Sequence, residues 1–225
     1  MPAVSAPRQL TLALGHSESF ARDDFLHGVS NAAALALVDD WPDWPSRIMA
    51  ICGPQGAGKS HLAAIWGERA GARFLAGRSL DRDLPPAALA TGALVLEDLA
   101  AGRLDEQALF HLINLARQDG AYVLLTARES PTRWPVGLPD LASRLRAIPV
   151  VTLEAPDDGL LAGVIAKLFA DRQLVVDDAL IRYLLARVER SIAAVRGAVE
   201  RLDREAMQRR RPVSRALAAE LYRDE

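Results

Sequence analysis

A glycine-rich octapeptide placed between an apolar run and a helical pattern restricts the fold of this sequence more than any other feature. Residues 53–60, Gly-Pro-Gln-Gly-Ala-Gly-Lys-Ser, fit the pattern G-x-x-x-x-G-K-[ST]. They follow the apolar run 47–52 and precede a helical pattern over residues 59–70. Glycines let backbone amides turn inward around phosphate oxygens, and the following helix adds its positive end. This order of strand, loop and helix predicts a phosphate-binding loop (P-loop).

The residue types in the loop predict how it would hold a nucleotide. Lys59 would reach the β- and γ-phosphates, and the Ser60 hydroxyl would bind Mg²⁺. A glycine-rich turn without a ligand is the alternative, and the flanking strand and helix disfavour it. The candidate nucleotide-binding residues of this stretch are Gly53, Pro54, Gln55, Gly56, Ala57, Gly58, Lys59, Ser60 and His61.

Two acidic residues follow another apolar run and are candidates for the metal. A P-loop needs a carboxylate at the end of a neighbouring strand, and residues 94–96 lead directly into Glu97 and Asp98. We predict that Glu97, together with Ser60, holds Mg²⁺. The sequence leaves open whether Glu97 or Asp98 holds it. Two exposed acids at a strand end are the simpler alternative.

Strand and helix patterns alternate through the first two thirds of the chain. The predicted strands cover 47–52, 73–75, 94–96, 122–126 and 148–153, and residues 9–14 also alternate like an extended strand. The predicted helices cover 31–38, 59–70 and 105–118, with a helical or irregular stretch near 85–90. Alternation of this kind predicts an α/β fold with a parallel five-stranded sheet.

The pattern after Pro156 is entirely helical. Helix-capping residues precede four apolar patterns with helical spacing, and they are Asp157, Asp177 or Asp178, Ser191 and Ser214. We therefore predict three parts: an N-terminal segment (1–18), an α/β nucleotide-binding core (19–155) and a helical lid domain (156–225).

Composition excludes several classes of protein. The 225 residues include 27 Lys and Arg against 29 Asp and Glu, a net charge of −2, which argues against a globally basic nucleic-acid binder. A single cysteine, Cys52, excludes a disulfide framework and a multi-cysteine zinc site, and its apolar run predicts a core residue. Without an apolar run of 18 residues or a signal peptide, we expect a cytoplasmic protein that does not enter a membrane.

Two arginines, Arg144 and Arg196, are candidates for contacting phosphate by residue type, and position alone does not distinguish either from a surface residue. Arg144 precedes the last predicted strand, and Arg196 lies on the third helix of the lid. Arginine can stabilise phosphate charge from the same chain or from a partner. A solvated surface arginine is the simpler interpretation of each.

Taken in order along the chain, these features resemble an AAA+ ATPase. The P-loop, Glu97-Asp98, Ser143-Arg144-Leu145 and a lid arginine are similar to the AAA+ module of the bacterial replication initiator DnaA. The spacing Phe25-x-x-Gly28-x-x-Asn31 resembles the initiator's nucleotide-base segment.

A shorter family resembles the chain more closely, the DnaA regulatory inactivators (Hda), which lack the initiator's DNA-binding domain. Members carry a clamp-binding motif of the form QL[ST]LxL, found here at 9–14, and the string Leu-Pro-Asp-Leu-Ala-Ser-Arg-Leu, found here at 138–145. The resemblance extends from Gln9 to the last helix.

The resemblance implies a negative regulator of chromosomal replication initiation. Gln9, Leu10, Leu12 and Leu14 would bind the β sliding clamp of DNA polymerase III, as an extended peptide whose alternate side chains fill pockets. Arg144 would act as an arginine finger on the nucleotide held by DnaA. The protein would contact DNA only indirectly, through the clamp. Whether it forms a homodimer or a higher oligomer is left open.

The resemblance also implies roles around the chain's own nucleotide. Phe25 and Asn31 would contact the base, Arg196 would close the lid, and Thr126 would stand at the sensor 1 position at the end of a strand. The cofactors would be ADP or ATP with Mg²⁺. Related inactivators favour ADP, and the sequence does not decide between the two.

Two departures from the family pattern bear on catalysis. Glu97 stands where aspartate is usual, and Thr126-Ala127-Arg128-Glu129 replaces the initiator's Thr-Ser/Gly-Asp-Arg. They predict weak or no intrinsic ATPase activity. The alternative functions are a helicase-loader-like AAA+ ATPase and a small-molecule P-loop kinase. The sequence also leaves open whether the arginines at 209–211 contact DNA or form a solvated helix end.

Overall fold

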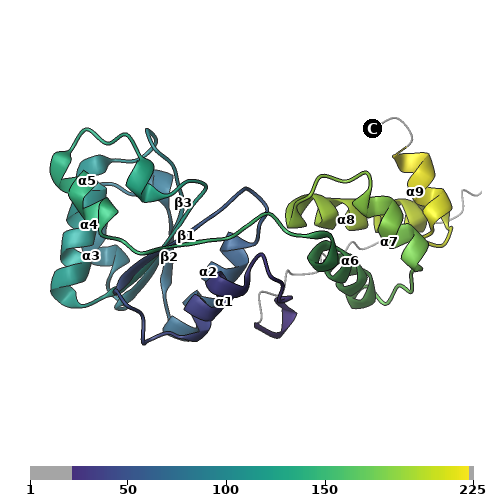
Figure 1. The fold of residues 1–225 in the computed structure, drawn as a ribbon, viewed down its shortest axis with the longest axis horizontal. Helices are drawn as coiled ribbons and strands as arrows, with labels where there is room; N and C mark the ends of the chain where they lie inside the picture. Colours follow the sequence, from purple (N-terminus) through teal and green to yellow (C-terminus); the bar gives the residue numbers. More distant parts are fainter. Residues whose placement is uncertain (1–21, 223–225) are drawn as a thin grey trace, which may run out of the picture.

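The protein has two lobes, an α/β lobe and a smaller all-helical lobe (Figure 1). The computed structural model describes residues 22–222. The chain builds the α/β lobe first and then crosses to the helical lobe, where the described residues end. The predicted fold class is confirmed, because a parallel sheet is followed by helices alone.

The sheet of the α/β lobe has five parallel strands in the order β2-β3-β4-β1-β5. Their bounds are β1 (Ile48–Cys52), β2 (Arg73–Ala76), β3 (Ala93–Leu99), β4 (Tyr122–Ala127) and β5 (Val150–Thr152). The central strands are covered on both faces, which explains their nearly continuous apolar sequences. This order places β4 between β1 and β3, so the carboxyl ends of these three strands lie side by side.

Helices cover both faces of the sheet. A first layer packs around Trp66 and contains α1 (Ala32–Asp39) and α2 (Lys59–Ala70). A second layer packs around Leu109 and contains α3 (Pro85–Ala88), α4 (Glu106–Asp119) and α5 (Pro139–Arg146). A short 3₁₀ turn, η1 (Arg22–Asp24), precedes α1.

The helical lobe has its own hydrophobic core, centred on the fully buried Phe169. Its helices are α6 (Asp158–Asp171), α7 (Asp178–Leu185), α8 (Ile192–Arg209) and α9 (Arg215–Leu221). Each begins after a side chain that accepts a backbone N–H of the first turn, and these caps are Asp157, Asp177, Ser191 and Ser214. The predicted caps are therefore confirmed, and Asp177 is the cap of α7. The predicted boundary at residue 156 stays a prediction and falls between β5 and α6.

Three elements differ from the prediction. Strand β3 is longer than the predicted 94–96, because it continues through Glu97 and Asp98 to Leu99. The sequence analysis gave no helix over Pro139–Arg146, because only Leu141 and Leu145 of α5 are buried apolar residues and an eight-residue pattern is weak. Strand β5 is shorter than the predicted 148–153, since the N–H of Ile148 donates to Leu145 O at the end of α5 and the paired register begins at Val150.

Cys52, the single cysteine, lies in the hydrophobic core as predicted. It is buried, and burial raises the pKa of its thiol to about 11. Arg209 and Arg211 both bind the carboxylate of Glu220, which joins the end of α8 to α9. No helix within the described residues is long and apolar enough to cross a membrane.

Candidate nucleotide-binding site

The P-loop connects the end of β1 to the start of α2. Its backbone takes left-handed conformations at Gly56 (φ 74°) and Gly58 (φ 103°), which side chains rarely adopt. The N–H of Gly53 donates to Ala127 O at 3.2 Å, so the loop begins against the end of β4. The predicted strand–loop–helix geometry is therefore present.

Lys59 is the buried cation of the site. Its side chain is only 7% exposed, and Nζ donates to Gly53 O and Pro54 O, both at 2.8 Å. Burial lowers the pKa of Lys59; the carboxylate of Asp98 opposes this shift and the guanidinium of Arg128 adds to it. A buried ammonium group beside the glycine-rich P-loop attracts an anion.

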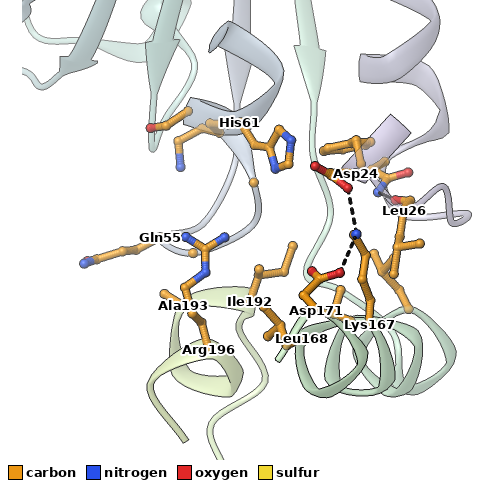
Figure 2. Close-up of a pocket in the computed structure, with 18 of the residues that line it drawn as sticks. Asp24, Leu26, Gln55, His61, Lys167, Leu168, Asp171, Ile192, Ala193 and Arg196 are labelled. Atoms are coloured by element: carbon orange, nitrogen blue, oxygen red, sulfur yellow. Dashed lines mark hydrogen bonds and ion pairs between the residues drawn. The ribbon is translucent and has the colours of Figure 1, made fainter. Parts of the chain in front are cut away.

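A cavity of about 590 Å³ opens between the P-loop, the segment 24–31, and helices α6 and α8. This volume lies within the range of small-molecule and cofactor sites. Most of the predicted P-loop residues line it, namely Gln55, Gly56, Gly58, Lys59, Ser60 and His61. Four residues predicted from other parts of the chain line it too: Phe25, Asn31, Asp98 and Arg196. Figure 2 shows Arg196 rising from α8 toward the loop that carries Gln55.

One part of the cavity lining, which we call the base end, is apolar. Phe25 is buried, and its ring contacts the ring of His61 edge-on, with 5.1 Å between centroids. A stripe of α6 formed by Leu160, Val164 and Leu168 lines the same cavity. Stacking on apolar and aromatic surface is a means of holding a nucleobase, so this end suits the base.

Asn31 organises the chain beside the base end. Its Nδ2 donates to Leu26 O at 2.9 Å and its Oδ1 accepts from Gly28 N at 2.9 Å. The side chain is 2% exposed. The predicted base-contact residue therefore holds segment 26–28 in shape, and the cavity wall depends on it.

The residues predicted to hold Mg²⁺ carry suitable oxygen ligands, but the structure brings only some of them to the cavity. Ser60 and Asp98 line the cavity, whereas Glu97 does not. Oε1 of Glu97 is buried and has no hydrogen-bond donor within residues 22–222. These hydroxyl and carboxylate oxygens are ligands that Mg²⁺ prefers, and Mg²⁺ at phosphates needs only one or two carboxylates. The described residues accordingly contain no cluster of three His, Cys, Asp or Glu side chains that could hold a metal by itself.

Several predicted residues lie outside the cavity lining, namely Gly53, Pro54, Ala57, Glu97, Thr126 and Arg144. Thr126 is buried (1% exposed), and its hydroxyl accepts the N–H of Asp98 at 3.1 Å, so it supports the left-handed turn of Asp98 (φ 54°). Arg144 is exposed on α5. The clamp-motif residues Gln9, Leu10, Leu12 and Leu14 lie outside the described residues.

Several residues that line the cavity were not predicted. Lys167 on α6 pairs with Asp24 at 2.7 Å and with Asp171 at 3.2 Å, and Figure 2 shows this triad beside the base end. Lys167 is one of only two lysines in the chain, and this rarity could have marked it as a candidate site residue. Arg128 also lines the cavity. Its place directly after a strand adjacent to the P-loop strand could have indicated it.

The helical lobe contacts the P-loop directly. The N–H of Ile192, the first residue of α8, donates to Gly56 O at 2.9 Å. A Cβ at Gly56 would lie 2.9 Å from Ser191 Cβ. The position of α8, and with it Arg196, is therefore tied to the conformation of the loop.

Comparison with known proteins supports the fold through structure rather than through sequence. No family model and no curated protein matches the chain. Domain III of the Thermotoga maritima replication initiation protein DnaA is similar over 91% of this chain and 96% of that chain, with TM-score 0.75 and 19% identity. DnaA from Aquifex aeolicus bound to AMPPCP matches 85% of this chain and 68% of that one, with TM-score 0.66 and 18% identity.

A second group of structures is also similar. The Thermotoga maritima Holliday junction branch migration motor RuvB matches 76% of this chain and 59% of that chain, with TM-score 0.62 and 17% identity. Together these likenesses establish a DnaA-like AAA+ fold.

Proposed function

We propose that this chain is a nucleotide-bound AAA+ adaptor that shuts off replication initiation. In this proposal residues 9–14 bind the DNA-loaded β sliding clamp, and Arg144 accelerates hydrolysis of ATP held by DnaA. The observation that carries the proposal is the exposure of Arg144 outside the chain's own cavity, in a fold similar to DnaA domain III. An arginine placed in this way is available to the nucleotide of another subunit.

The anchoring of α5 supports a role that needs a fixed position. Leu141 and Leu145 are buried on one side of the helix. The carboxylate of Glu106 accepts the N–H of Gly137 at 3.0 Å and of Leu138 at 2.8 Å, so the start of α5 is held to the start of α4. Arg144 is thus an exposed cation on a rigid support, which reduces the entropic cost of contacting a partner.

The chain's own cavity would hold the nucleotide that keeps the adaptor in shape. The P-loop amides, Lys59 and Arg196 would bind the phosphates, and Phe25 with the stripe of α6 would hold the base. Mg²⁺ bound by Ser60 and the carboxylates of Glu97 or Asp98 would neutralise phosphate charge. Which nucleotide is bound, and whether a homodimer or higher oligomer forms, belongs to the proposal and its tests.

The test is hydrolysis of labelled ATP on DnaA, measured with this protein and with the clamp loaded on DNA. Arginines supplied by a partner accelerate other P-loop systems by about 10³–10⁵. We expect clamp-dependent acceleration that Arg144→Ala abolishes, while nucleotide and clamp binding persist. Arg146→Ala is the matched control, because Arg146 is exposed on the same helix. Unchanged acceleration by Arg144→Ala would contradict the mechanism.

The clamp segment is tested separately. Leu12→Ala should abolish clamp binding and clamp-dependent acceleration, whereas Ala13→Ser, at a position that the motif does not define, should preserve both. If deletion of residues 1–14 leaves cellular function intact, a helicase-loader-like ATPase is favoured. Phosphate transfer to a nucleoside or metabolite would favour the kinase alternative.

A further inference from the structure

The helical lobe contains two stretches of sequence without an acidic residue. Residues 179–188 and 206–219 have no Asp or Glu, and their six arginines are Arg182, Arg187, Arg209, Arg210, Arg211 and Arg215. The first stretch belongs mainly to α7 and the second leads into α9, and these two helices pack against each other. Figure 1 shows both helices at the end of the helical lobe that lies away from the α/β lobe. Packing therefore joins two acid-free stretches into one surface.

Tyr183 positions two of these arginines. The guanidinium of Arg187 lies over its ring, 4.1 Å from the centroid, and that of Arg215 lies 6.0 Å from the same centroid. Arg187 follows α7 and Arg215 begins α9, so the ring joins cations from two helices. An arginine that lies over a ring can still donate its N–H groups to oxygen atoms. Both arginines are exposed, as is Arg182. We call Arg182, Tyr183, Arg187 and Arg215 the α7–α9 patch.

The arginines of the α7–α9 patch have no carboxylate beside them to neutralise their charge. Arg190, on the same lobe, lies 2.9 Å from Asp158. By contrast, Arg182, Arg187 and Arg215 form no ion pair within residues 22–222. Three exposed cations on one surface therefore leave a local positive charge, although the chain as a whole has a net charge of −2. Such a surface attracts an anionic partner.

We propose that the α7–α9 patch binds the phosphate backbone of duplex DNA. The inference rests on the proposed function, in which the clamp holds this protein on a DNA duplex. The forked guanidinium suits two phosphate oxygens. Arg187 covers one face of the Tyr183 ring, which reduces the surface on which an unpaired base could stack and favours duplex over single-stranded DNA. This direct contact departs from the expectation that the protein reaches DNA only through the clamp.

The position of the patch lets DNA and DnaA be contacted at the same time. Figure 1 shows α5, which carries Arg144, at the opposite end of the molecule from α7 and α9. Non-specific contacts to phosphates are weak, with Kd of about 10⁻⁴–10⁻⁶ M. In the proposed complex the clamp tethers the protein to the duplex, which raises the effective concentration of DNA to about the millimolar range. A weak contact is then sufficient.

The experiment measures the fluorescence anisotropy of a labelled duplex of about 30 base pairs, titrated with the full chain without clamp at about 50 to 200 mM salt. Three phosphate contacts predict a slope of log K against log salt of about −3. The double variant Arg187→Ala/Arg215→Ala should bind at least about tenfold more weakly, with a slope of about −1. Arg47→Ala is the matched control, because Arg47 is an exposed arginine 4.6 Å over the Tyr122 ring in the other lobe. It should leave affinity and slope unchanged.

Two further double variants separate charge from stability. Arg187→Gln/Arg215→Gln keeps most of each aliphatic stem beside Tyr183 and removes the charge, so it should bind DNA as weakly as the alanine variant. Arg187→Lys/Arg215→Lys keeps the charge and should retain a slope of about −3. A glutamine variant that binds DNA like the wild type would contradict the phosphate contact.

The outcomes distinguish this inference from the proposed function. No binding of duplex by the wild type at about 50 mM salt, unchanged binding by the alanine variant, or tighter binding of a single strand of equal length would overturn the inference alone. An alanine variant that binds DNA normally but no longer accelerates ATP hydrolysis on DnaA would assign the patch to an acidic protein surface and also overturn it. A wild-type chain that binds duplex but not the clamp would overturn the proposed function and support the DNA contact.

Discussion

The two ends of the cavity are built in different ways. At the phosphate end, one continuous segment supplies the loop amides and Lys59, and adjacent parallel strands supply Asp98 and Arg128. At the base end, Phe25 comes from the segment before α1, and the facing stripe comes from α6 in the other lobe. The α/β lobe therefore supplies most of the phosphate end, to which α8 adds Arg196, whereas the base end exists only when the two lobes are docked.

The largest effect is expected from a substitution in the core of the helical lobe. Phe169→Ala should destabilise this lobe by about 3–5 kcal/mol, the range for deleting a buried phenylalanine. Because Phe169 packs in a hydrophobic cluster separate from those of the sheet, hydrogen exchange should rise in α6–α9 and remain slow in β1–β4. Leu109→Ala, in the core of the other lobe, should produce the reverse pattern. Equal acceleration of exchange in both lobes would show that they unfold as one unit.

The contact between P-loop and helical lobe is tested by two glycines. Gly56→Ala and Gly71→Ala both place a side chain in a left-handed conformation, at a cost of about 1–2 kcal/mol each. Only the Cβ of Gly56→Ala would also meet Ser191, whereas nothing lies within 4 Å of the Cβ at Gly71. We expect both variants to have a lower melting temperature than the wild type, Gly56→Ala the lower of the two, and a loss of nucleotide affinity in Gly56→Ala alone. Equal nucleotide affinities of the two variants by calorimetry would mean that the contact between the P-loop and the helical lobe does not affect nucleotide binding.

The ion pair at the base end should have a smaller effect. Lys167→Met removes the pairs to Asp24 and Asp171, which are partly exposed and therefore contribute about 1 kcal/mol or less. Because these pairs lie away from the phosphates, we expect ATP and ADP affinities to fall by the same factor, below about tenfold. The control is Arg190→Ala, which breaks an exposed pair with Asp158 inside the helical lobe. A change in the ratio of ATP to ADP affinity would refute this division of roles.

The smallest expected effect concerns acid. Arg22 binds Asp39 at 2.7 Å, and this hydrogen bond lowers the pKa of Asp39 from its ordinary 3.8. A lowered pKa in the folded state means that the stabilisation is present above pH 3.8 and is lost as the pH falls through the lower folded value. Asp39→Asn should therefore reduce the loss of unfolding free energy in acid by less than about 1 kcal/mol, measured by denaturation at several pH values, since both side chains are 45% exposed. The control is Asp43→Asn, which makes the same substitution at an exposed position.

Local signals in the sequence predicted most of the structure. The P-loop, helix α2 with its observed ends and the four capped helices of the second lobe depend on residues that are close in the chain. Helix α5 could not be predicted in this way, because its short pattern gains its stability from packing on α4. The base end was predicted in part: Phe25 and Asn31 were identified, whereas the apolar stripe of α6 was not identified as part of a site.

What the sequence determined by itself is the chemistry of the phosphate end, because backbone turns, a following helix and a lysine all come from eight consecutive residues. The tertiary structure decided what surrounds it. The order of the strands brought Arg128 between the loop and Asp98, and docking of the lobes turned one stripe of α6 toward Phe25. The same docking places Arg196 in the lining of the cavity. Arg144 instead lies on the exposed side of α5. Sheet order and lobe docking arise from contacts between residues far apart in the chain, which periodicity and motif spacing do not encode.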